Sequence, residues 1–381
     1  MEYKKKVLLL GPAYPFRGGI ADTQNYLGQN LNSLGHDIQI FTFASQYPKL
    51  LFPGKSQFSN EKAPDFIHIK RKIHSYNPLN WPKVARLINE QKPDCVIFRF
   101  WTPFLAPCWQ GIARRLNTNI KKIGLVDNWI PHETKMWDKT LTQMFSNQMD
   151  GFATLSSAVA NQISYEKPNV PIWKGFHPIA DNLPAIISTK EARISLGWPL
   201  DKKIVLFFGL IRKYKGLDLL IQAFAQAPIK DSNIILAIVG EAYEPEDKYT
   251  SIIKKYKLQD RMICDFNYAN SQKSSLVFCA ADVVAQTYIS ATQSGVTPLA
   301  YHYKTPLLVS NLPGLSAPIV EDRTGLITEN KPKKIAENLN KILQGRSKSN
   351  FKPAFEKAQE KYSWSTFGKS LIKFISQLQA P

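Results

Sequence analysis

The chain has 381 residues, enough for two domains of ordinary size, and its composition, 44% hydrophobic and 21% charged, excludes an intrinsically disordered protein. No apolar run approaches the ~18 residues that a membrane span needs. The first residues run directly into an apolar strand, so we expect no signal peptide. Four cysteines without a C-x-x-C pair argue against a disulfide framework and a zinc site, and they fit a reducing cytoplasm.

The formal net charge of +19 favours anionic partners: sugar phosphates, anionic lipids or nucleic acid. No helix-turn-helix, zinc-finger or RNA-recognition pattern occurs, so nucleic acid is not an expected partner. The basic runs Lys4–Lys6 and Lys70–Lys72 could contact an anionic membrane surface, at ~1 kcal/mol for each well-placed cation, and the alternative for each is a solvated surface. We therefore expect a cytoplasmic protein, with peripheral attachment to the inner face of the membrane as a further hypothesis.

The first half of the chain alternates short apolar strands with helical patterns. A strand over residues 6–12 is followed by a glycine-containing loop, a helix over 22–33 and a second strand over 36–43. This β-α-β unit requires parallel strands, because a crossover helix returns the chain to its starting edge. Further strands are predicted at residues 94–100, 120–127 and 151–155.

The alternation begins again near residue 200. Strands are predicted at residues 204–210, 234–239, 262–265, 282–285 and 306–309. The polar stretch 178–201, which holds several turn formers, is predicted to connect two domains. We therefore predict an α/β protein of two doubly wound, Rossmann-like domains that face each other across a cleft, residues 1–183 and 184–363. The apolar stripe of the last helical pattern favours docking onto a domain over membrane insertion.

The most informative segment is 207–224, in which a buried strand passes through a basic turn into a helix. Arg212 and Lys215 follow Gly209 where a parallel strand leads into a helix N-terminus. Backbone N–H groups and the helix dipole favour an anion there, so we predict a diphosphate site, with a solvated basic turn as the alternative. No Asp-x-Asp triplet is present to hold a divalent metal, so we expect these cations and helix dipoles to neutralise the diphosphate without a metal or cofactor.

Other loops after predicted strands contribute candidates for the same ligand. Residues 291–297 place hydroxyl and small side chains at a helix start, which suits a phosphate or a sugar and equally suits an N-cap. The candidates in this loop are Thr292, Gln293, Ser294, Gly295 and Val296. Glu241 ends another strand and is a further candidate for contact with the ligand.

The first half holds two candidate loops. Gly18 and Gly19 let the backbone approach a ligand at a helix N-terminus, with a plain tight turn as the alternative. Residues 126–133 place an acid, an amide, an imidazole and a second acid after a strand, where Asp127 or His132 is predicted to act as a base or an orienting group. The residues predicted on the acceptor side are Arg17, Gly18, Asn128 and Glu133.

With these segments placed, the chain resembles the GT-B glycosyltransferases, specifically the retaining family 4, over nearly its whole length. The resemblance rests on the Gly-Gly loop, on Gly209 with Lys215-Gly216, on Pro306-Leu-Leu-Val with Pro313-Gly-Leu, and on Thr324-Gly-Leu-Ile. Within the family, the chain is similar to a subgroup that carries Phe-Arg-Gly-Gly-Ile-Ala, Leu-Phe-Pro-Gly-Lys, Asp-Asn-x-x-Pro-His-Glu and Ser-Ala-Thr-Gln-Ser-Gly.

The resemblance implies a nucleotide-diphosphate-sugar donor on the second domain and a glycan or lipid-linked acceptor on the first. It also implies retention of anomeric configuration, no metal, and a final helix, 364–381, that crosses back onto the first domain. Asp127 lies about where many members have a catalytic-site histidine. The residues carried over as catalytic are Asp127, His132, Arg212 and Lys215. The residues assigned to the donor are Gly19, Gly209, Arg212, Lys215, Glu241, Thr292, Gln293, Ser294, Gly295 and Val296.

The chain departs from the family at its Glu-x7-Glu pair, which falls on Ala291 and Leu299. Neutral hydrogen bonds from residues 292–294 would replace these carboxylates, at roughly half the strength of charge-assisted bonds. We expect a glycosyltransferase of cell-surface polysaccharide or glycolipid synthesis. One alternative is a catalytically degenerate partner protein that binds a nucleotide sugar, and another is a phosphorylase or sugar-nucleotide epimerase of the same fold.

Overall fold

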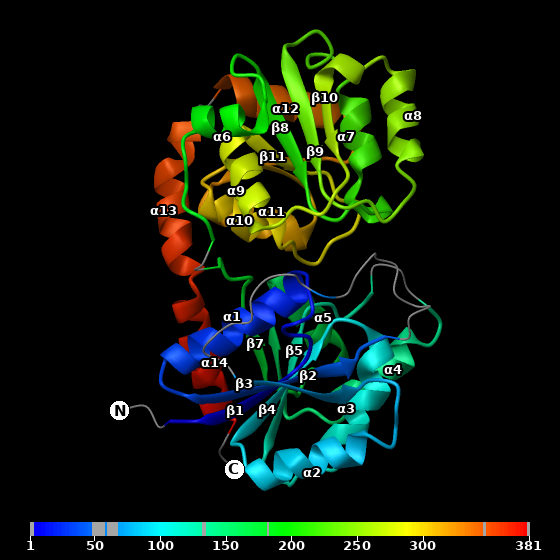
Figure 1. The fold of residues 1–381 in the computed structure, drawn as a ribbon, viewed down its shortest axis with the longest axis vertical. Coiled ribbons are helices and arrows are strands. Elements are labelled where there is room, and N and C mark those ends of the chain that lie inside the picture. The colour runs from blue at the N-terminus through cyan, green and yellow to red at the C-terminus, as the bar shows by residue number, and fades with distance from the viewer. Residues whose placement is uncertain are drawn as a thin grey trace. The chain divides into compact units, whose positions relative to one another are not determined.

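The computed structural model describes residues 4–47, 58, 68–131, 135–180, 183–345 and 348–378. The chain divides into two compact α/β units, one of residues 1–178 with 364–381 and one of residues 179–363. The division thus falls between residues 178 and 179, where the sequence predicted it between 183 and 184. Figure 1 shows helices on both faces of the sheet in each unit.

Over its described residues, the first unit contains a seven-stranded parallel sheet in the order β3-β2-β1-β4-β5-β6-β7. Its strands are β1 (Lys6–Leu10), β2 (Asp37–Ser45), β3 (His68–His74), β4 (Cys95–Phe100), β5 (Lys121–Val126), β6 (Gly151–Thr154) and β7 (Ile172–Lys174). Its helices are α1 (Gly19–Ser33), α2 (Trp81–Gln91), α3 (Ala106–Ala113), α4 (Asp138–Ser146), α5 (Ser157–Glu166) and α14 (Trp364–Gln377).

The central strands are apolar on both faces because helices cover both. All six residues of β4 are buried. Helices α2, α3, α4 and α5 contribute to the core on one face, and α1 and α14 contribute to the core on the other. The direction of strand order reverses between β1 and β4, and open α/β sheets bind ligands at the carboxyl ends of the strands beside such a reversal.

Helix α14 completes the core of the first unit although it ends the chain. Phe367 is fully buried, and its ring centroid lies 4.8 Å from that of Trp173 and 5.5 Å from that of Phe176. Gly368 lets α14 approach α1, since a Cβ there would lie 2.1 Å from the side-chain oxygen of Asn30. The apolar stripe of α14 is therefore used for packing within this unit.

The second unit has, across the part that the structure describes, a six-stranded parallel sheet in the order β10-β9-β8-β11-β12-β13. Its strands are β8 (Lys203–Phe208), β9 (Ile234–Val239), β10 (Met262–Asp265), β11 (Val283–Gln286), β12 (Leu307–Ser310) and β13 (Gly325–Thr328). Its helices are α6 (Thr189–Leu196), α7 (Leu217–Ala223), α8 (Asp247–Lys255), α9 (Ser271–Ala280), α10 (Val296–His302), α11 (Pro313–Asp322), α12 (Pro332–Gly345) and α13 (Lys352–Lys361). The predicted fold class, two doubly wound α/β domains, is confirmed.

The stretch 178–201, predicted to connect the two domains, begins at the division between the units and also contains α6, which was not predicted. The helix begins with a capping box: the Ser188 hydroxyl accepts from the Glu191 backbone N–H at 3.2 Å, and the Glu191 carboxylate accepts from the Ser188 N–H at 3.0 Å. Arg193 then anchors the helix by donating to Asp282 at 2.7 Å. The Ser-x-x-Glu signal was present in the sequence, but the polar composition around it concealed the helix.

Strand β3 was not predicted, because its exposed cations conceal its alternation. Lys70, Arg71 and Lys72 lie on this strand at the edge of the sheet, where cations discourage pairing with another chain. Arg71 donates to the backbone carbonyls of Phe43 and Ala44 at 3.3 and 3.1 Å. This position gives the run a structural role, and its contact with an anionic membrane surface stays a prediction.

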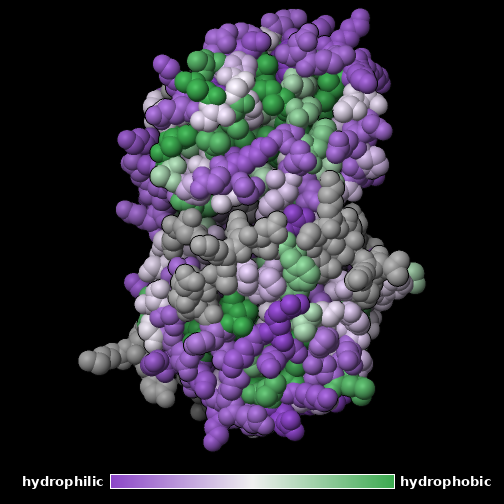
Figure 2. All heavy atoms as spheres, in the orientation of Figure 1, coloured by the Kyte–Doolittle hydropathy of each residue, from purple (hydrophilic) through white to green (hydrophobic). Residues whose placement is uncertain are grey.

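None of the described helices combines the length and apolar composition that a bilayer span requires. Hydrophilic residues cover most of the coloured surface in Figure 2, and apolar residues form small groups among them.

The packing of α14 leads to a prediction about stability. Replacing Phe367 with Ala should lower the free energy of unfolding by about 3–5 kcal/mol, because it leaves a cavity in a fully buried aromatic cluster. Urea denaturation followed by circular dichroism measures the change. Lys369→Ala, on the exposed side of the same helix, is the control and should change stability by less than about 0.5 kcal/mol. Equal midpoints for the two variants would contradict the role assigned to α14.

Candidate functional site

The predicted residues of the second unit gather where its strand order reverses, between β8 and β11. The loop after β8 is held against the loop after β9 by a short bridge, in which Ile211 donates to the Glu241 carbonyl at 2.8 Å and Tyr243 donates to the Ile211 carbonyl at 3.0 Å. Gly240 permits this approach, because it has φ +146° and a Cβ there would lie 2.1 Å from the Gly209 carbonyl oxygen. Glu241 thus supports the basic loop through its backbone.

Lys215 is drawn into the interior by a second close backbone contact. Gly216 has φ +61°, and a Cβ there would lie 2.1 Å from the Thr287 carbonyl oxygen. The Thr287 hydroxyl also donates to the Gly216 carbonyl at 2.9 Å, which ties the loop after β8 to the loop after β11. As a result Lys215 is only 8% exposed, and its ammonium lies 5.5 Å from the centre of the Tyr288 ring.

Lys215 carries a buried charge with no carboxylate counter-ion among the residues that the structure describes. Burial and the nearby charge of Arg212 lower the pKa of Lys215 from its ordinary value of 10.5 to about 8. The Arg212 guanidinium itself lies 5.0 Å above the Tyr243 ring. Two cations within one turn, one of them desolvated, form a site that an anion would stabilise.

The loop before α10 lies against the same region, beside Gly209 and Lys215. The Val296 side chain and the Lys215 ammonium lie 3.6 and 3.1 Å from the position of a Cβ on Gly209. The Ser294 hydroxyl accepts from the Val296 N–H at 3.2 Å and lies 3.4 Å from the Tyr288 hydroxyl. Ser294 therefore supports the start of α10 through Val296, but the N-cap residue is Gly295 and no side chain caps the helix, so the N-cap alternative for the hydroxyl residues is not confirmed.

Other predicted donor residues are placed by the same loop. Gly314 packs on the backbone of Thr292, since a Cβ there would lie 2.2 Å from the Thr292 carbonyl oxygen. Thr292 is 9% exposed, Gln293 is half-buried and Gly295 is exposed. The structure therefore brings Gly209, Lys215 and Val296 into one small region, and it places the remaining members of the loop around the start of α10.

In the first unit, the predicted residues Arg17, Gly18 and Gly19 follow β1, one of the two strands at the reversal point. Gly18 has φ +106°, which favours glycine, and α1 begins at the next residue. No described atom lies within 4 Å of a Cβ position on Gly18 or Gly19. Arg17 is half-buried beside this start.

Asp127 forms a buried ion pair that the sequence did not reveal. Its carboxylate accepts from Arg99 Nε at 2.5 Å and from Arg99 Nη2 at 2.6 Å, and both side chains are at most 5% exposed. Arg99 Nη2 also donates to the Thr23 hydroxyl of α1 at 3.0 Å. Because both oxygens of Asp127 are engaged, the geometry favours the orienting role predicted for it over the role of a base. The available signal was an arginine in the otherwise apolar strand Cys-Val-Ile-Phe-Arg-Phe.

Two further polar groups near this pair were missed from the sequence. Burial lowers the pKa of His177 against the opposing effect of its hydrogen bond to the Pro178 carbonyl, and the charges of Arg99 and Asp127 act in opposite directions. The amide of Gln24 is fully buried and has no hydrogen-bond partner among the described residues. Neither residue stands in a motif that local reasoning would single out.

The remaining predicted residues of the first unit divide between described and undescribed parts of the chain. Asn128 is half-buried beside Asp127. His132 and Glu133 lie outside the described residues, so their predicted roles stay predictions. Among the described residues, no group of three or more His, Cys, Asp and Glu side chains could hold a metal ion.

Comparison with known proteins assigns a family to each unit. The family model "Glycosyltransferase Family 4" matches residues 17–167, in the first unit, and "Glycosyl transferases group 1" matches residues 188–360, in the second. The chain consists of two glycosyltransferase-family domains. Gly18, Asp127 and Lys215 all fall within the matched ranges.

Curated relatives agree with these two domains. D-inositol 3-phosphate glycosyltransferase of Corynebacterium aurimucosum is 27% identical over 191 residues, which are 48% of this chain and 45% of that protein. Spore coat protein SA of Bacillus subtilis is 23% identical over 196 residues, 48% of this chain and 51% of that protein. The chain therefore spans about half the length of the curated relatives it matches.

Solved glycosyltransferase structures share the complete fold. Sucrose-phosphate synthase of Thermosynechococcus elongatus superposes with a TM-score of 0.76 at 16% identity, covering 98% of this chain and 99% of that one. HepE of Anabaena, in complex with UDP-glucose, superposes with a TM-score of 0.74 at 14% identity, covering 98% and 100%. These likenesses establish the GT-B fold for the chain.

The electrostatics of Lys215 predict a pH dependence of anion binding by this GT-B protein. With a pKa of about 8, the protonated fraction of Lys215 falls from about nine-tenths at pH 7 to about one-tenth at pH 9. Because only the ammonium form attracts an anion, the affinity for ADP should fall about tenfold over this range, and binding at pH 9 should take up a proton. Calorimetry in buffers of different ionisation enthalpy measures both. Lys213→Ala, an exposed control in the same turn, should keep this dependence, and Lys215→Arg should remove it.

The ion pair of the first unit predicts a double-variant effect on stability. Asp127→Asn should lower the free energy of unfolding by about 3–5 kcal/mol, because it leaves the Arg99 guanidinium buried without a counter-charge. The double variant Arg99→Met/Asp127→Leu should recover much of that loss by removing both charges. Urea denaturation measures both quantities. A single variant as stable as the parent would show that the pair is not a structural requirement.

Proposed function

We propose that the chain is a retaining, metal-independent glycosyltransferase that transfers a sugar from a nucleotide-diphosphate-sugar to a glycan or lipid-linked acceptor in cell-surface polysaccharide or glycolipid synthesis. The observation that carries the proposal is the buried ammonium of Lys215 at the reversal point of the second sheet, without a carboxylate counter-ion among the described residues. A buried charge is unfavourable unless it is paired, and a diphosphate supplies the missing anion.

The donor half of the proposal rests on the second unit. Lys215 and Arg212 would stabilise the negative charge that develops on the diphosphate as its bond to the sugar breaks, so the leaving group needs no metal in this scheme. The backbone at Gly209 and the start of α10 would lie against the same phosphates. The HepE structure, which shares the fold, was determined with UDP-glucose, and this supports a nucleotide sugar as the ligand class.

The acceptor half rests on the first unit. Gly18 and Gly19 lie at the start of α1, after β1, and Asp127 and Asn128 follow β5 at the same edge of the parallel sheet. The Arg99 pair would fix the position of Asp127, so that the loop after β5 presents its polar groups to the acceptor in one orientation. The relatives named D-inositol 3-phosphate glycosyltransferase support a hydroxyl-bearing acceptor.

A second candidate, a catalytically degenerate protein that binds the nucleotide sugar without turnover, is favoured by one observation. The positions of the family's two glutamates hold Ala291 and Leu299. The neutral residues of the loop would then have to hold the ribose and the sugar with weaker bonds. Both candidates predict binding of the nucleotide sugar, and only the enzyme predicts its turnover.

A thermal-denaturation screen of nucleotides and nucleotide sugars, carried out in EDTA, tests the proposal. One nucleoside diphosphate at 100 times its dissociation constant should stabilise the fold by about 2.7 kcal/mol. Lys215→Ala should lose this stabilisation and Lys213→Ala should keep it.

Turnover then separates the two candidates. Release of nucleoside diphosphate from the matching nucleotide sugar in EDTA, reduced about 10²–10³-fold by Lys215→Ala, would support the enzyme. Binding without release would favour the degenerate protein. Absence of stabilisation by any nucleotide would overturn both.

A further inference from the structure

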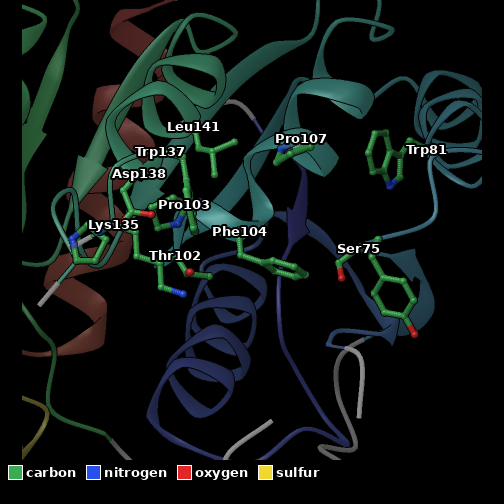
Figure 3. A pocket seen from close by; sticks show the side chains of 12 residues that line it. Ser75, Trp81, Thr102, Pro103, Phe104, Pro107, Lys135, Trp137, Asp138 and Leu141 are labelled. Atoms are coloured by element: carbon green, nitrogen blue, oxygen red, sulfur yellow. The ribbon is translucent and has the colours of Figure 1, made fainter. Parts of the chain in front are cut away.

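A pocket in the first unit lies apart from the Arg99–Asp127 pair and has no assigned role. It has a volume of about 480 Å³ and is formed by the segments that follow β3, β4 and β5 (Figure 3). Its walls are largely aromatic and proline side chains, with a few polar groups. This size and composition are those of a small-molecule site, for which ~300–1,000 Å³ is typical.

Two of the aromatic side chains that line the pocket are held by contacts with residues outside it. The Trp81 indole donates to the His74 carbonyl at 3.0 Å. Its ring also packs against α3, where a Cβ on Gly111 would lie 2.3 Å from the ring. The Tyr76 hydroxyl lies 2.6 Å from the Ser45 hydroxyl. A ligand would therefore find Trp81 and Tyr76 already ordered, so that binding would lose little conformational entropy at these two rings.

Three of the polar residues, Thr102, Lys135 and Asp138, lie at one end of the pocket, and Ser75 lies toward the other. Figure 3 shows Thr102, Lys135 and Asp138 close to Trp137, while Trp81 lies at the opposite end and Phe104 lies between them. Asp138 lines the pocket, and one of its carboxylate oxygens accepts from the Lys135 backbone N–H at 2.7 Å. Thr102 supplies a hydroxyl that can donate or accept.

We propose that this pocket binds a pyranose ring of the acceptor, so that the acceptor is a glycan recognised through its sugar. The inference rests on the proposed function and names the acceptor class for the first unit. A pyranose carries a face of C–H groups, which suits the negatively polarised faces of Trp81, Phe104 and Trp137, and a rim of hydroxyls, which suits Thr102 and Asp138.

The polar end argues against a lipid chain as the occupant. An alkyl chain would cover the Thr102 hydroxyl and the Asp138 carboxylate without offering either a hydrogen bond, and buried polar groups without partners weaken binding. A sugar offers hydroxyls to both groups and uses the same aromatic surfaces. The lipid alternative therefore serves as the competing outcome in the test.

Saturation-transfer NMR on the full chain tests this assignment. The probes are the methyl glycosides of glucose, galactose, mannose and N-acetylglucosamine, with octyl glucoside below its micelle concentration as a probe that carries a sugar and an alkyl chain together. We expect ring-proton signals from at least one sugar, reduced at least fivefold by Trp137→Ala and clearly weakened by Thr102→Val. Trp137 is 60% exposed, so its replacement should not disturb folding.

The matched control is Met136→Ala, which replaces a neighbouring side chain that is 97% exposed and does not line the pocket. This variant should keep the ring-proton signals. The inference is overturned if no sugar gives a ring-proton signal, or if the signal that depends on Trp137 falls on the alkyl chain of octyl glucoside.

The same samples separate this inference from the proposed function. Stabilisation by a nucleoside diphosphate should be equal in the parent and in Trp137→Ala, because Lys215 lies in the other unit. Nucleotide binding without a sugar signal would overturn the pocket assignment alone. Absence of nucleotide binding by the parent protein would overturn the proposed function.

Discussion

The burial of Lys215 is the constraint on which the candidate donor site depends. Two close backbone contacts, Gly240 on Gly209 and Gly216 on Thr287, draw the loop after β8 against its neighbours, and Lys215 in this loop is only 8% exposed. The lowered pKa of Lys215 corresponds to a destabilisation of its charged form on the order of 3 kcal/mol. Any side chain at Gly240 or Gly216 would break these contacts. The site therefore depends first on the backbone conformation at these two glycines.

The first unit also buries a cation, but there the charge is paired with a carboxylate. Its buried cation, Arg99, is paired with Asp127 and donates a further bond to Thr23, so the charge is neutralised within the protein. A paired charge does not require an anionic ligand, whereas the charge of Lys215 does. This difference supports an anionic ligand on the second unit and an uncharged one on the first, which is the division that a nucleotide-sugar donor and a glycan acceptor would need.

The aromatic pocket is a second feature of the first unit that suits an uncharged ligand. The pocket formed after β3, β4 and β5 presents aromatic rings together with the hydrogen-bonding groups of Thr102 and Asp138. These are the two kinds of contact that a sugar makes and that an alkyl chain cannot make in full. The protein would thus recognise the acceptor through aromatic surfaces and a few hydrogen bonds.

The sequence by itself determined the two α/β halves, most of the strands and the basic turn at Arg212 and Lys215, because buried strands and strand-to-helix turns leave signals within a few neighbouring residues. It missed β3, whose exposed cations conceal its alternation, and α6, whose capping box lay in a polar stretch. Only the tertiary structure decided that Arg99 pairs with Asp127 and that three separate segments form one aromatic pocket. These features depend on contacts between residues distant in the chain, and such contacts follow from how the strands are ordered in the sheet, which local sequence patterns do not encode.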